Sequence, residues 1–512
     1  MQFRTTIGIA VALAAGVCSA ATYMWTGGAG DGKFSSPANW GGEPAAFTAE
    51  DTCVFVNTAA LDVTVDEPVT VGTITFSGFG ALTVGGEATL TVTRMTNVYS
   101  QQPVFNCPVV FSAGYLVDFA TEGVNFAGGV TASGPSASLP DTAVTHTLLG
   151  EFHFTADWVQ DVKLTYPYVV PSGSKLYGRQ LSGTTTDGTT DTNPSGLALV
   201  IEEGGYAEFD KIISMNNFLR VSVRGRLKLN DVYQVGVNDG RANVNSHVGF
   251  DGDENSIGVI EAGGIHKYSQ GNCYVKVPTL YVGAQGLGAK IQDYTLHLDG
   301  CDKTVYATAD FEIMGPFRSA DPTDWGLVLD KAMTLDTQGF TVTWTGGARG
   351  SGALIKTGAG TLVMKPHGCN FTGAVTVSGG TLKIGGQGGV GGSPITVASG
   401  ATLEFDNPDK TVISNSVTLE DGSTLAFNIA GGLLQGRPSV ITPPASGTVA
   451  IAVTGDLGVI GTTYPLTSGA AISQEDFARF SLQGRNDLEM SLSDAGDIVL
   501  TVLDSALVSS SL

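Results

Sequence analysis

A Thr-Leu pair that returns at nearly constant spacing is the strongest constraint on how this chain folds. The pair recurs with steps of 20, 21 and 22 residues, at Thr361-Leu362, Thr381-Leu382, Thr402-Leu403 and Thr424-Leu425. Repeats of this length mark architectures in which one unit cannot bury its apolar face alone and stacks on the next unit. The spacing therefore predicts a stack of turns of ~21 residues each, with the four leucines as an interior ladder.

The residues within each turn alternate between apolar and polar, as in short strands with one buried side. Val375 and Val377 flank Thr376, and the same pattern returns at 395–397 and 417–419. Turns that contain glycine separate these runs, because bends and close backbone approaches need it. The sequence thus predicts an all-β coil with parallel sheets. Its outward positions in this region are Thr376, Lys383, Thr396, Glu404 and Thr418.

A similar alternation occurs earlier at finer spacing. Pairs of apolar residues recur every 8 residues, at Ile74 and Phe76, Leu82 and Val84, and Leu90 and Val92. Successive strands of a coil would produce this spacing, and so would a meander of hairpins. Both interpretations stay open at this point.

Composition agrees with an all-β chain that makes many turns. There are 70 glycines in 512 residues, yet 42% of the residues are hydrophobic and only 14% are charged, so apolar residues are too plentiful for a disordered chain. The formal charge of −22 becomes −23 if residues 1–21 are removed, because Arg4 is their only charged residue. This acidity argues against nucleic acid and anionic membranes as partners.

Residues 1–21 have the organisation of a secretory signal. Arg4 precedes an apolar run at Ile7–Val17, and Cys18-Ser19-Ala20-Ala21 supplies the small residues of a cleavage site, with cleavage fitting after either alanine. Val17 stands where a lipoprotein signal needs a small residue, which disfavours a lipid anchor. No later segment approaches the ~20 apolar residues of a membrane-spanning helix. We therefore expect a protein that is secreted or held on the outer cell surface.

The stretch from Gly350 to Gly386 resembles the autotransporter-associated β-strand repeat of bacterial passenger domains. That pattern is a Gly-x-Gly-x-Leu-x-Lys-x-Gly-x-Gly-Thr-Leu run, then Asn-x-(Tyr/Phe)-Thr-Gly, then Thr-x-Val-x-x-Gly-Thr-Leu. The matching residues are Gly350, Gly352, Leu354, Lys356, Gly358, Gly360, Thr361, Leu362, Asn370, Phe371, Thr372, Gly373, Val377, Gly380, Thr381 and Leu382. Two positions depart: Phe371 follows Asn370 without a spacer, and Ala374-Val375 replaces Thr-Thr.

The segment MWTGGAGDGKFSSPANW, residues 24–40, resembles the leader that often precedes such repeats. The resemblance implies a right-handed parallel β-helix on the surface of, or secreted by, a Gram-negative bacterium. About 60 residues follow the last clear repeat, which is fewer than an 8-strand translocator barrel needs. We therefore expect the repeat without the translocator.

These observations predict five segments, with an irregular β-rich segment in the middle that either continues the coil or interrupts it. They are the signal peptide (1–21), an N-terminal cap with the first coil turns (22–135), the irregular segment (136–335), the repeat solenoid (336–450) and a C-terminal β cap (451–512). Whether residues 136–335 continue the solenoid cannot be derived from the repeat pattern.

Two groups of side chains are candidate binding sites. Asp251, Asp253 and Asn255 alternate in a way that could aim oxygens at calcium, but an acidic surface turn is the favoured interpretation because EF-hand positions are not matched. Trp25, Phe34 and Trp40 could form a platform for sugar rings, although plugging the apolar end of the coil is the favoured role. No other cofactor is indicated.

Five cysteines remain once the signal is removed: Cys53, Cys107, Cys273, Cys301 and Cys369. They are far apart and odd in number, so the spacing indicates no disulfide framework and leaves one isolated pair open. The six histidines are equally scattered, without zinc-binding spacing.

Many secreted β-helices act on polysaccharides, and such enzymes need carboxylates or a base that converge on one face. The regular repeats show no paired acids, and the cluster of Glu202, Glu203, Glu208 and Asp210 is interpreted as a solvated acidic turn. We therefore predict a non-enzymatic structural or adhesive protein, with surface glycans or other extracellular components as candidate partners. A polysaccharide lyase or glycoside hydrolase with its site in residues 136–335 is the alternative.

Overall fold

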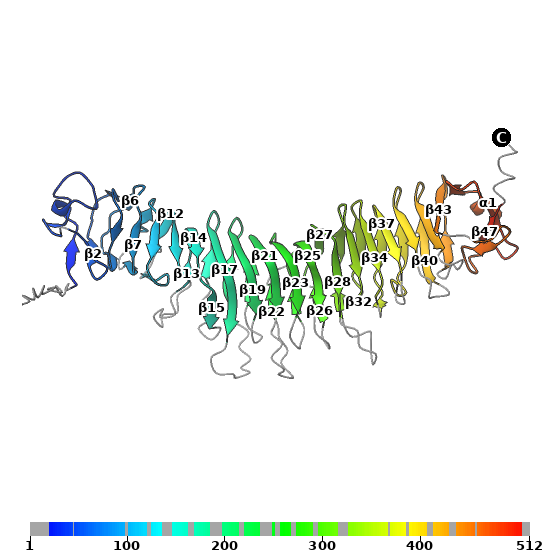
Figure 1. Cartoon of the computed structure of the whole chain (residues 1–512), viewed down its shortest axis with the longest axis horizontal. Coiled ribbons are helices and arrows are strands. Elements are labelled where there is room, and N and C mark those ends of the chain that lie inside the picture. Colours follow the sequence, from blue (N-terminus) through cyan, green and yellow to red (C-terminus); the bar gives the residue numbers. More distant parts are fainter. Residues whose placement is uncertain are drawn as a thin grey trace, which may run out of the picture. The chain divides into compact units, whose positions relative to one another are not determined.

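A computed structural model provides the structure of the chain (Figure 1). It describes residues 20–44, 46–97, 101–119, 124–135, 146–161, 168–184, 197–214, 220–235, 248–250, 257–267, 273–289, 295–298, 300–315, 326–366, 369–385, 389–406, 413–429, 437–455 and 458–503. The strands form a parallel β-solenoid of about 13 turns, which confirms the predicted fold class. The chain divides into two compact units, residues 1–142 with 149–153 and residues 143–148 with 154–512.

In the first unit, each turn of the coil contributes three short strands to three parallel ladders. The first ladder holds β1 (Thr22–Met24), β2 (Thr52–Phe55), β5 (Thr73–Phe76), β8 (Arg94–Asn97) and β11 (Val117–Phe119). The second holds β3 (Leu61–Thr64), β6 (Leu82–Gly85) and β9 (Val104–Phe105), and the third holds β4 (Val69–Thr70), β7 (Leu90–Val92) and β10 (Val109–Phe111). Strand β12 (Asn125–Ala132) pairs with both β9 and β10.

The spacing of 8 residues between the apolar pairs of this unit is the sequence separation between strands on adjacent faces of the coil. Ile74, Leu82 and Leu90 lie on β5, β6 and β7, which belong to three different parallel ladders. All three side chains are fully or almost fully buried. The hairpin interpretation of this segment is therefore wrong, and the coil interpretation is right.

The second unit contains the repeats that the sequence marks most clearly. One ladder runs through β31 (Thr341–Trp344), β34 (Thr361–Met364), β37 (Thr381–Ile384), β39 (Thr402–Phe405), β41 (Thr424–Ile429), β43 (Val449–Gly455) and β45 (Phe480–Gln483). Leu362, Leu382, Leu403 and Leu425 are in register and completely buried. The predicted interior ladder of leucines is therefore confirmed.

A second ladder lies beside it along the same repeats. It holds β30 (Met333–Asp336), β33 (Leu354–Thr357), β36 (Val375–Val377), β38 (Ile395–Val397), β40 (Ile413–Leu419) and β42 (Pro438–Thr442). Val375 and Val377 are buried, whereas Thr376 between them is half-buried, as the alternation predicts.

Parallel strands also continue through residues 154–335, so the solenoid includes the middle of the chain. Its long strands are β17 (Lys175–Thr184), β19 (Tyr206–Ser214), β21 (Arg226–Val235), β23 (Val259–Lys267) and β25 (Thr279–Ala289), which lie side by side in Figure 1, followed by β27 (Lys303–Ala307) and β28 (Phe311–Met314). Strand β15 (Trp158–Asp161) precedes β17.

The remaining face of this unit is a ten-stranded parallel sheet. It consists of β13 (His146–Thr147), β16 (Tyr168–Val170), β18 (Leu197–Ile201), β20 (Arg220–Val223), β22 (Val248–Phe250), β24 (Cys273–Val275), β26 (Thr295–Leu298), β29 (Gly326–Leu329), β32 (Gly347–Gly350) and β35 (Cys369–Phe371). Its inward residues include Val170, Ile201 and Leu329, which are fully buried.

Turn length is uneven in the middle of the chain. Equivalent positions on successive turns are occupied by Lys175, Tyr206, Arg226, Val259 and Thr279, so long and short steps alternate along the sequence. The register also shifts within most of these strand pairs, as it does at bulges where a strand bends. The solenoid therefore persists although the sequence period is lost.

The last strands form a small antiparallel sheet of β44 (Thr463–Pro465), β47 (Ile498–Val502) and β46 (Leu488–Leu492), with β47 in the centre. A short helix, α1 (Gln474–Phe477), is capped at its N-terminus by Ser473, whose hydroxyl accepts a hydrogen bond from the amide of Asp476. In the part of the chain that the structure describes, no helix is long and apolar enough to cross a membrane.

The repeat also buries one lysine among its apolar positions. On β33, Leu354 and Lys356 face inward and are buried, whereas Ile355 between them is half-buried. The Lys356 ammonium donates hydrogen bonds to the carbonyl oxygens of Thr357, Gly358 and Gly379 at 2.8–2.9 Å. Burial lowers the pKa of Lys356 to about 8. The lysine of the repeat thus joins the glycine turns of two successive coils from the inside.

Four cysteines whose side chains the structure describes are free thiols. Cys53, Cys107 and Cys301 are buried and Cys369 is half-buried. Burial raises the pKa of Cys107 to about 11 and also raises the pKa of Cys53 and Cys369. These three thiols remain protonated at neutral pH and pack as small apolar side chains.

Candidate interaction surface

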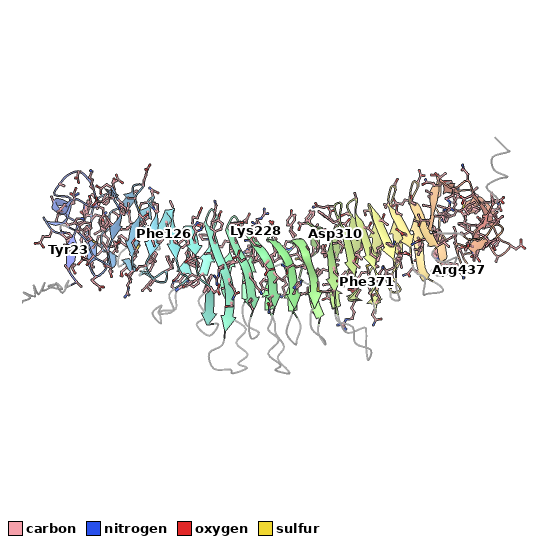
Figure 2. The ribbon with its side chains drawn as sticks, in the orientation of Figure 1. Tyr23, Phe126, Lys228, Asp310, Phe371 and Arg437 are labelled. Atoms are coloured by element: carbon pink, nitrogen blue, oxygen red, sulfur yellow. The ribbon has the colours of Figure 1, made fainter. Side chains whose placement is uncertain are left out.

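The outer face of the middle strands carries a continuous row of polar and aromatic side chains, which we call the outer row. Each member is in register with the next across neighbouring strands, in the order Tyr177, Glu208, Lys228, Glu261, Tyr281 and Tyr306. All six side chains are half-buried, and the residues that flank them along each strand face inward. Lys228 marks the row in Figure 2.

The inward neighbours explain why the outer row is held firmly. Leu176, Leu227 and Leu280 are completely buried, as are their counterparts Ala207 and Ile260. Because side chains alternate across a strand, burial of this set fixes the opposite set on the outer face. Strand spacing in a sheet is about 4.8 Å, so the row presents one side chain at each such step.

The charged members of the row are already paired. The ammonium of Lys228 lies 2.9 Å from a carboxylate oxygen of Glu208, and the guanidinium of Arg226 lies 2.6 Å from Glu261. The hydroxyl of Tyr206 donates to the other oxygen of Glu208 at 2.5 Å. The hydroxyl of Tyr206, followed by Lys228, holds the pKa of Glu208 below its ordinary value. Glu208 is therefore an ionised hydrogen-bond acceptor at neutral pH.

The tyrosines at one end of the row stack on each other. The rings of Tyr281 and Tyr306 lie 4.9 Å apart, centroid to centroid, at an interplanar angle of 16°. Each ring therefore covers a face of the other, and their edges and hydroxyls are what a partner would meet. Such an arrangement favours hydrogen bonding over the stacking of a sugar on an open aromatic face.

The structure separates the acidic cluster predicted from the sequence. Glu202 and Glu203 are exposed in the turn before β19, whereas Glu208 and Asp210 lie on the outer side of that strand. Asp210 accepts a hydrogen bond from the side-chain amide of Asn230 at 3.2 Å. The two carboxylates on the strand are thus engaged by neighbouring polar groups.

The calcium candidate Asp251, Asp253 and Asn255 lies outside the described residues, so it stays a prediction. Across the described ranges, no group of three or more His, Cys, Asp or Glu side chains is arranged to hold a metal ion.

The aromatic residues near the N-terminus form a packed cluster. Phe34 and Trp40 are buried, and Phe47 and Phe55 contact both of them at centroid distances of 5.3–6.3 Å. The half-buried Trp25 packs its ring edge-on against Trp40 at 4.9 Å. Their burial agrees with a packing role at this end and leaves little open ring surface for a sugar.

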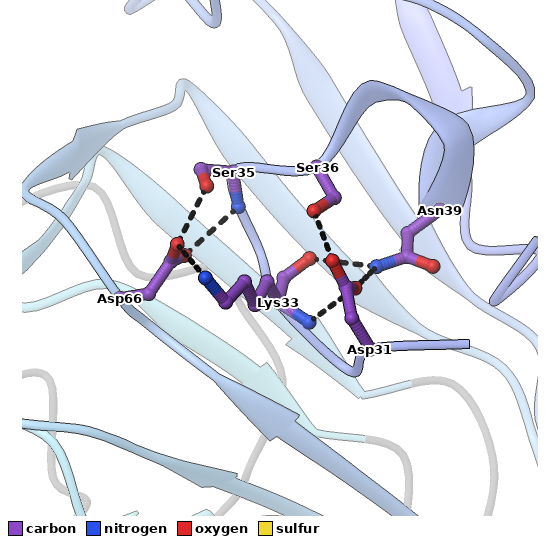
Figure 3. A network of polar contacts seen from close by, with 6 residues as sticks. All are labelled: Asp31, Lys33, Ser35, Ser36, Asn39 and Asp66. Atoms are coloured by element: carbon purple, nitrogen blue, oxygen red, sulfur yellow. Dashed lines mark hydrogen bonds and ion pairs between the residues drawn. The ribbon is translucent and has the colours of Figure 1, made fainter. Parts of the chain in front are cut away.

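A polar network holds the loop that carries this cluster (Figure 3). The Asp31 carboxylate accepts hydrogen bonds from the Ser36 hydroxyl, the Lys33 amide and the Asn39 side chain at 2.6–3.0 Å. These bonds, in that order, lower the pKa of Asp31 to about 2. Asp66 accepts from the hydroxyl and the amide of Ser35, which connects the loop to the residues after β3.

The outward side chains of the regular repeats are simpler than the outer row. Thr376 and Thr396 are half-buried and Thr418 is exposed on successive turns. Lys383 pairs with Glu404 and Asp406 at 2.9 and 2.8 Å. The sequence indicated this face correctly but gave no sign of the outer row, because the register there connects residues across turns of unequal length.

Comparison with known proteins agrees with the fold. The family model of the passenger-associated-transport-repeat matches residues 354–384, which span β33 to β37. The predicted resemblance of this stretch to passenger-domain repeats is therefore confirmed.

A second similarity is to the adhesin BmaC autotransporter of Brucella suis biovar 1 (strain 1330). The two sequences are 36% identical over 103 residues, which is 20% of this chain and 3% of the adhesin. The chain thus spans a small part of the relative that it matches. No solved structure matches the chain.

Proposed function

We propose that this chain is an adhesive or structural β-solenoid that works outside the cell, either secreted or on the outer surface, and that it is not an enzyme. The passenger-associated repeat and the similarity to an autotransporter adhesin support the location and the adhesive role. The proposed partner is a surface glycan, which would bind along the outer row.

The observation that carries this proposal is the register of the outer row. Six side chains with carboxylate, ammonium or phenol groups follow one another on neighbouring strands. A glycan presents many hydroxyl groups at intervals similar to the strand spacing, so several weak hydrogen bonds can form together. Glu208 is paired with Lys228, and Glu261 with Arg226, and groups engaged in this way suit a polar contact surface better than proton transfer.

The test measures binding and turnover on the same samples. Purified protein is applied to an array of neutral and acidic glycans, and the glycans that bind are incubated with it and analysed for new reducing ends or unsaturated products. We expect saturable binding without cleavage. Replacing Tyr281 and Tyr306 by alanine should weaken binding, whereas replacing the exposed Phe79 of the first unit should not.

Other outcomes would contradict parts of the proposal. Cleavage that disappears when a carboxylate of the middle segment is replaced would establish an enzyme. Binding that the two tyrosine substitutions leave unchanged would remove the outer row from the contact surface. Absence of binding to any glycan would leave a structural role alone.

A further inference from the structure

Asp51 is a buried carboxylate for which the described side chains supply no cation. The residue is 3% exposed. One oxygen accepts hydrogen bonds from the amide and the hydroxyl of Thr48 at 2.7 and 2.9 Å. The other accepts from the backbone nitrogen of Ala21 at 3.0 Å. Within the described ranges, no Lys, Arg or His side chain pairs with Asp51. A buried carboxylate in this position needs a counter-charge.

The backbone nitrogen of Ala21 is the group placed to supply that charge. Ala21 immediately precedes β1, and its carbonyl oxygen accepts a hydrogen bond from the amide of Thr52 at 2.7 Å. Strand β1 then pairs with β2 in register, starting with Thr22 opposite Thr52. The nitrogen of Ala21 is thus held against the carboxylate by the ladder. In an uncut chain this nitrogen is an uncharged amide.

We propose that the exported chain is cut between Ala20 and Ala21, and that the new α-ammonium of Ala21 is the counter-ion of Asp51. In the cut, water adds to the carbonyl carbon of Ala20, and the bond from that carbon to the nitrogen of Ala21 breaks. Ala20 leaves with a carboxylate, and Ala21 gains an amino group that is protonated at neutral pH. The inference depends on the location outside the cell that is proposed above.

The alternative cut, after Ala21, would remove the hydrogen bonds that Ala21 makes with Asp51 and Thr52. The chain would begin at Thr22, so the bond from Ala21 to Asp51 and the bond from Thr52 to Ala21 would both be lost. Of the two bonds that the sequence offers for cleavage, only the first leaves Asp51 with a positive partner in place.

The first test identifies the start of the exported protein. The full-length chain is expressed in a Gram-negative host, and the protein outside the cytoplasm is analysed by N-terminal sequencing and intact mass. We expect Ala21 as the first residue. A start at Thr22, or at any other residue, would overturn the proposal, although it would leave the extracellular location intact.

The second test examines the ion pair without export. Two proteins that begin at Ala21 are released from a fusion, one with a free amine and one acetylated, which keeps the N–H but removes the charge. Hydrogen exchange of the β1 amides should be slower by about tenfold or more in the free-amine protein, as a charged hydrogen bond implies. The Asp51→Asn substitution should abolish this difference, whereas Asp62→Asn, at an exposed position of β3, should preserve it.

The two tests fail in different ways. Equal exchange in the free and acetylated proteins would refute the ion pair, whatever the location of the protein. If the chain stays in the cytoplasm but the free-amine protein still exchanges more slowly than the acetylated protein in vitro, the proposed location and cleavage would be refuted. The ion pair between Ala21 and Asp51 would then still stand. The acetylated protein needs no substitution, so the comparison survives even if the Asp51→Asn variant does not fold.

Discussion

Replacing Leu403 by alanine should destabilise the coil locally and by a large amount. Leu403 is completely buried on β39, in register between Leu382 on β37 and Leu425 on β41. Removing a fully buried leucine side chain leaves a cavity, and such substitutions lower the free energy of unfolding by about 3–5 kcal/mol. Because each turn contacts only its neighbours, we expect the effect to concentrate on these three strands.

Hydrogen exchange followed by mass spectrometry measures this effect strand by strand. A loss of about 3 kcal/mol corresponds to exchange that is roughly 150-fold faster where local opening limits it. The matched control is Thr402→Ala on the same strand, because Thr402 faces outward and is half-buried. That substitution should change the free energy of unfolding by less than about 1 kcal/mol.

Two results would refute the reasoning. If Leu403→Ala and Thr402→Ala had equal effects, the alternation of buried and outward residues on β39 would not control stability. If protection fell equally over strands as distant as β17 and β19, the stability of the second unit would not be a sum of neighbouring turns. The Leu403→Asp substitution should be more severe than Leu403→Ala, because it places an unpaired carboxylate in the same position.

Four further outcomes are expected. The pKa of Lys356 is about 8 in the folded protein and 10.5 ordinarily, so the unfolded chain binds more protons between these two pH values. Lys356 should therefore make the free energy of unfolding rise by up to about 3 kcal/mol from pH 8 to 10.5. Denaturant titration should find this increase in the unsubstituted protein and not in Lys356→Met. The pKa of Asp31 is lowered from 3.8 to about 2, so its stabilisation of the N-terminal loop is present above pH 4 and lost as pH falls through 2; Asp31→Asn should remove this acid sensitivity in fluorescence melts. Gly373→Ala should lower the melting temperature, because the added methyl carbon would collide with the carbonyl oxygen of Gly352; an unchanged melt would contradict this close approach. Thermal melts with calcium and with chelator should nearly coincide, and a rise of many degrees with calcium would establish a site at residues 251–255.

The sequence predicted the leucine ladder because turns of nearly equal length return each leucine to the same interior position. It could not predict the middle turns, since long and short steps alternate there and erase the period. Interior positions there also include Ala207 and Ala262, which do not mark a buried strand by hydrophobicity alone. The coil continues because the backbone hydrogen bonds form between neighbouring strands, whatever the length of the segments that connect those strands.

The polar features of the molecule were harder to predict for a related reason. Glu208 and Lys228 are far apart in the sequence, as are Ala21 and Asp51, so each pair meets only through the register of neighbouring strands. Alternation assigns Glu208 to the outside of a strand, but it cannot say which charge lies beside it. Lys356 is the opposite case, because its charge suggests an outward position and the carbonyl groups of two glycine turns hold it inside.

The unequal turn lengths have a consequence for how such a protein changes over evolution. Lys175 and Tyr206 occupy equivalent positions on neighbouring turns across a long connection, and Tyr206 and Arg226 do so across a much shorter one. Insertions and deletions between strands are therefore tolerated wherever the strands themselves keep their pairing. A lineage can lengthen, shorten or exchange the segments between strands as independent modules, while the coil that carries them stays the same.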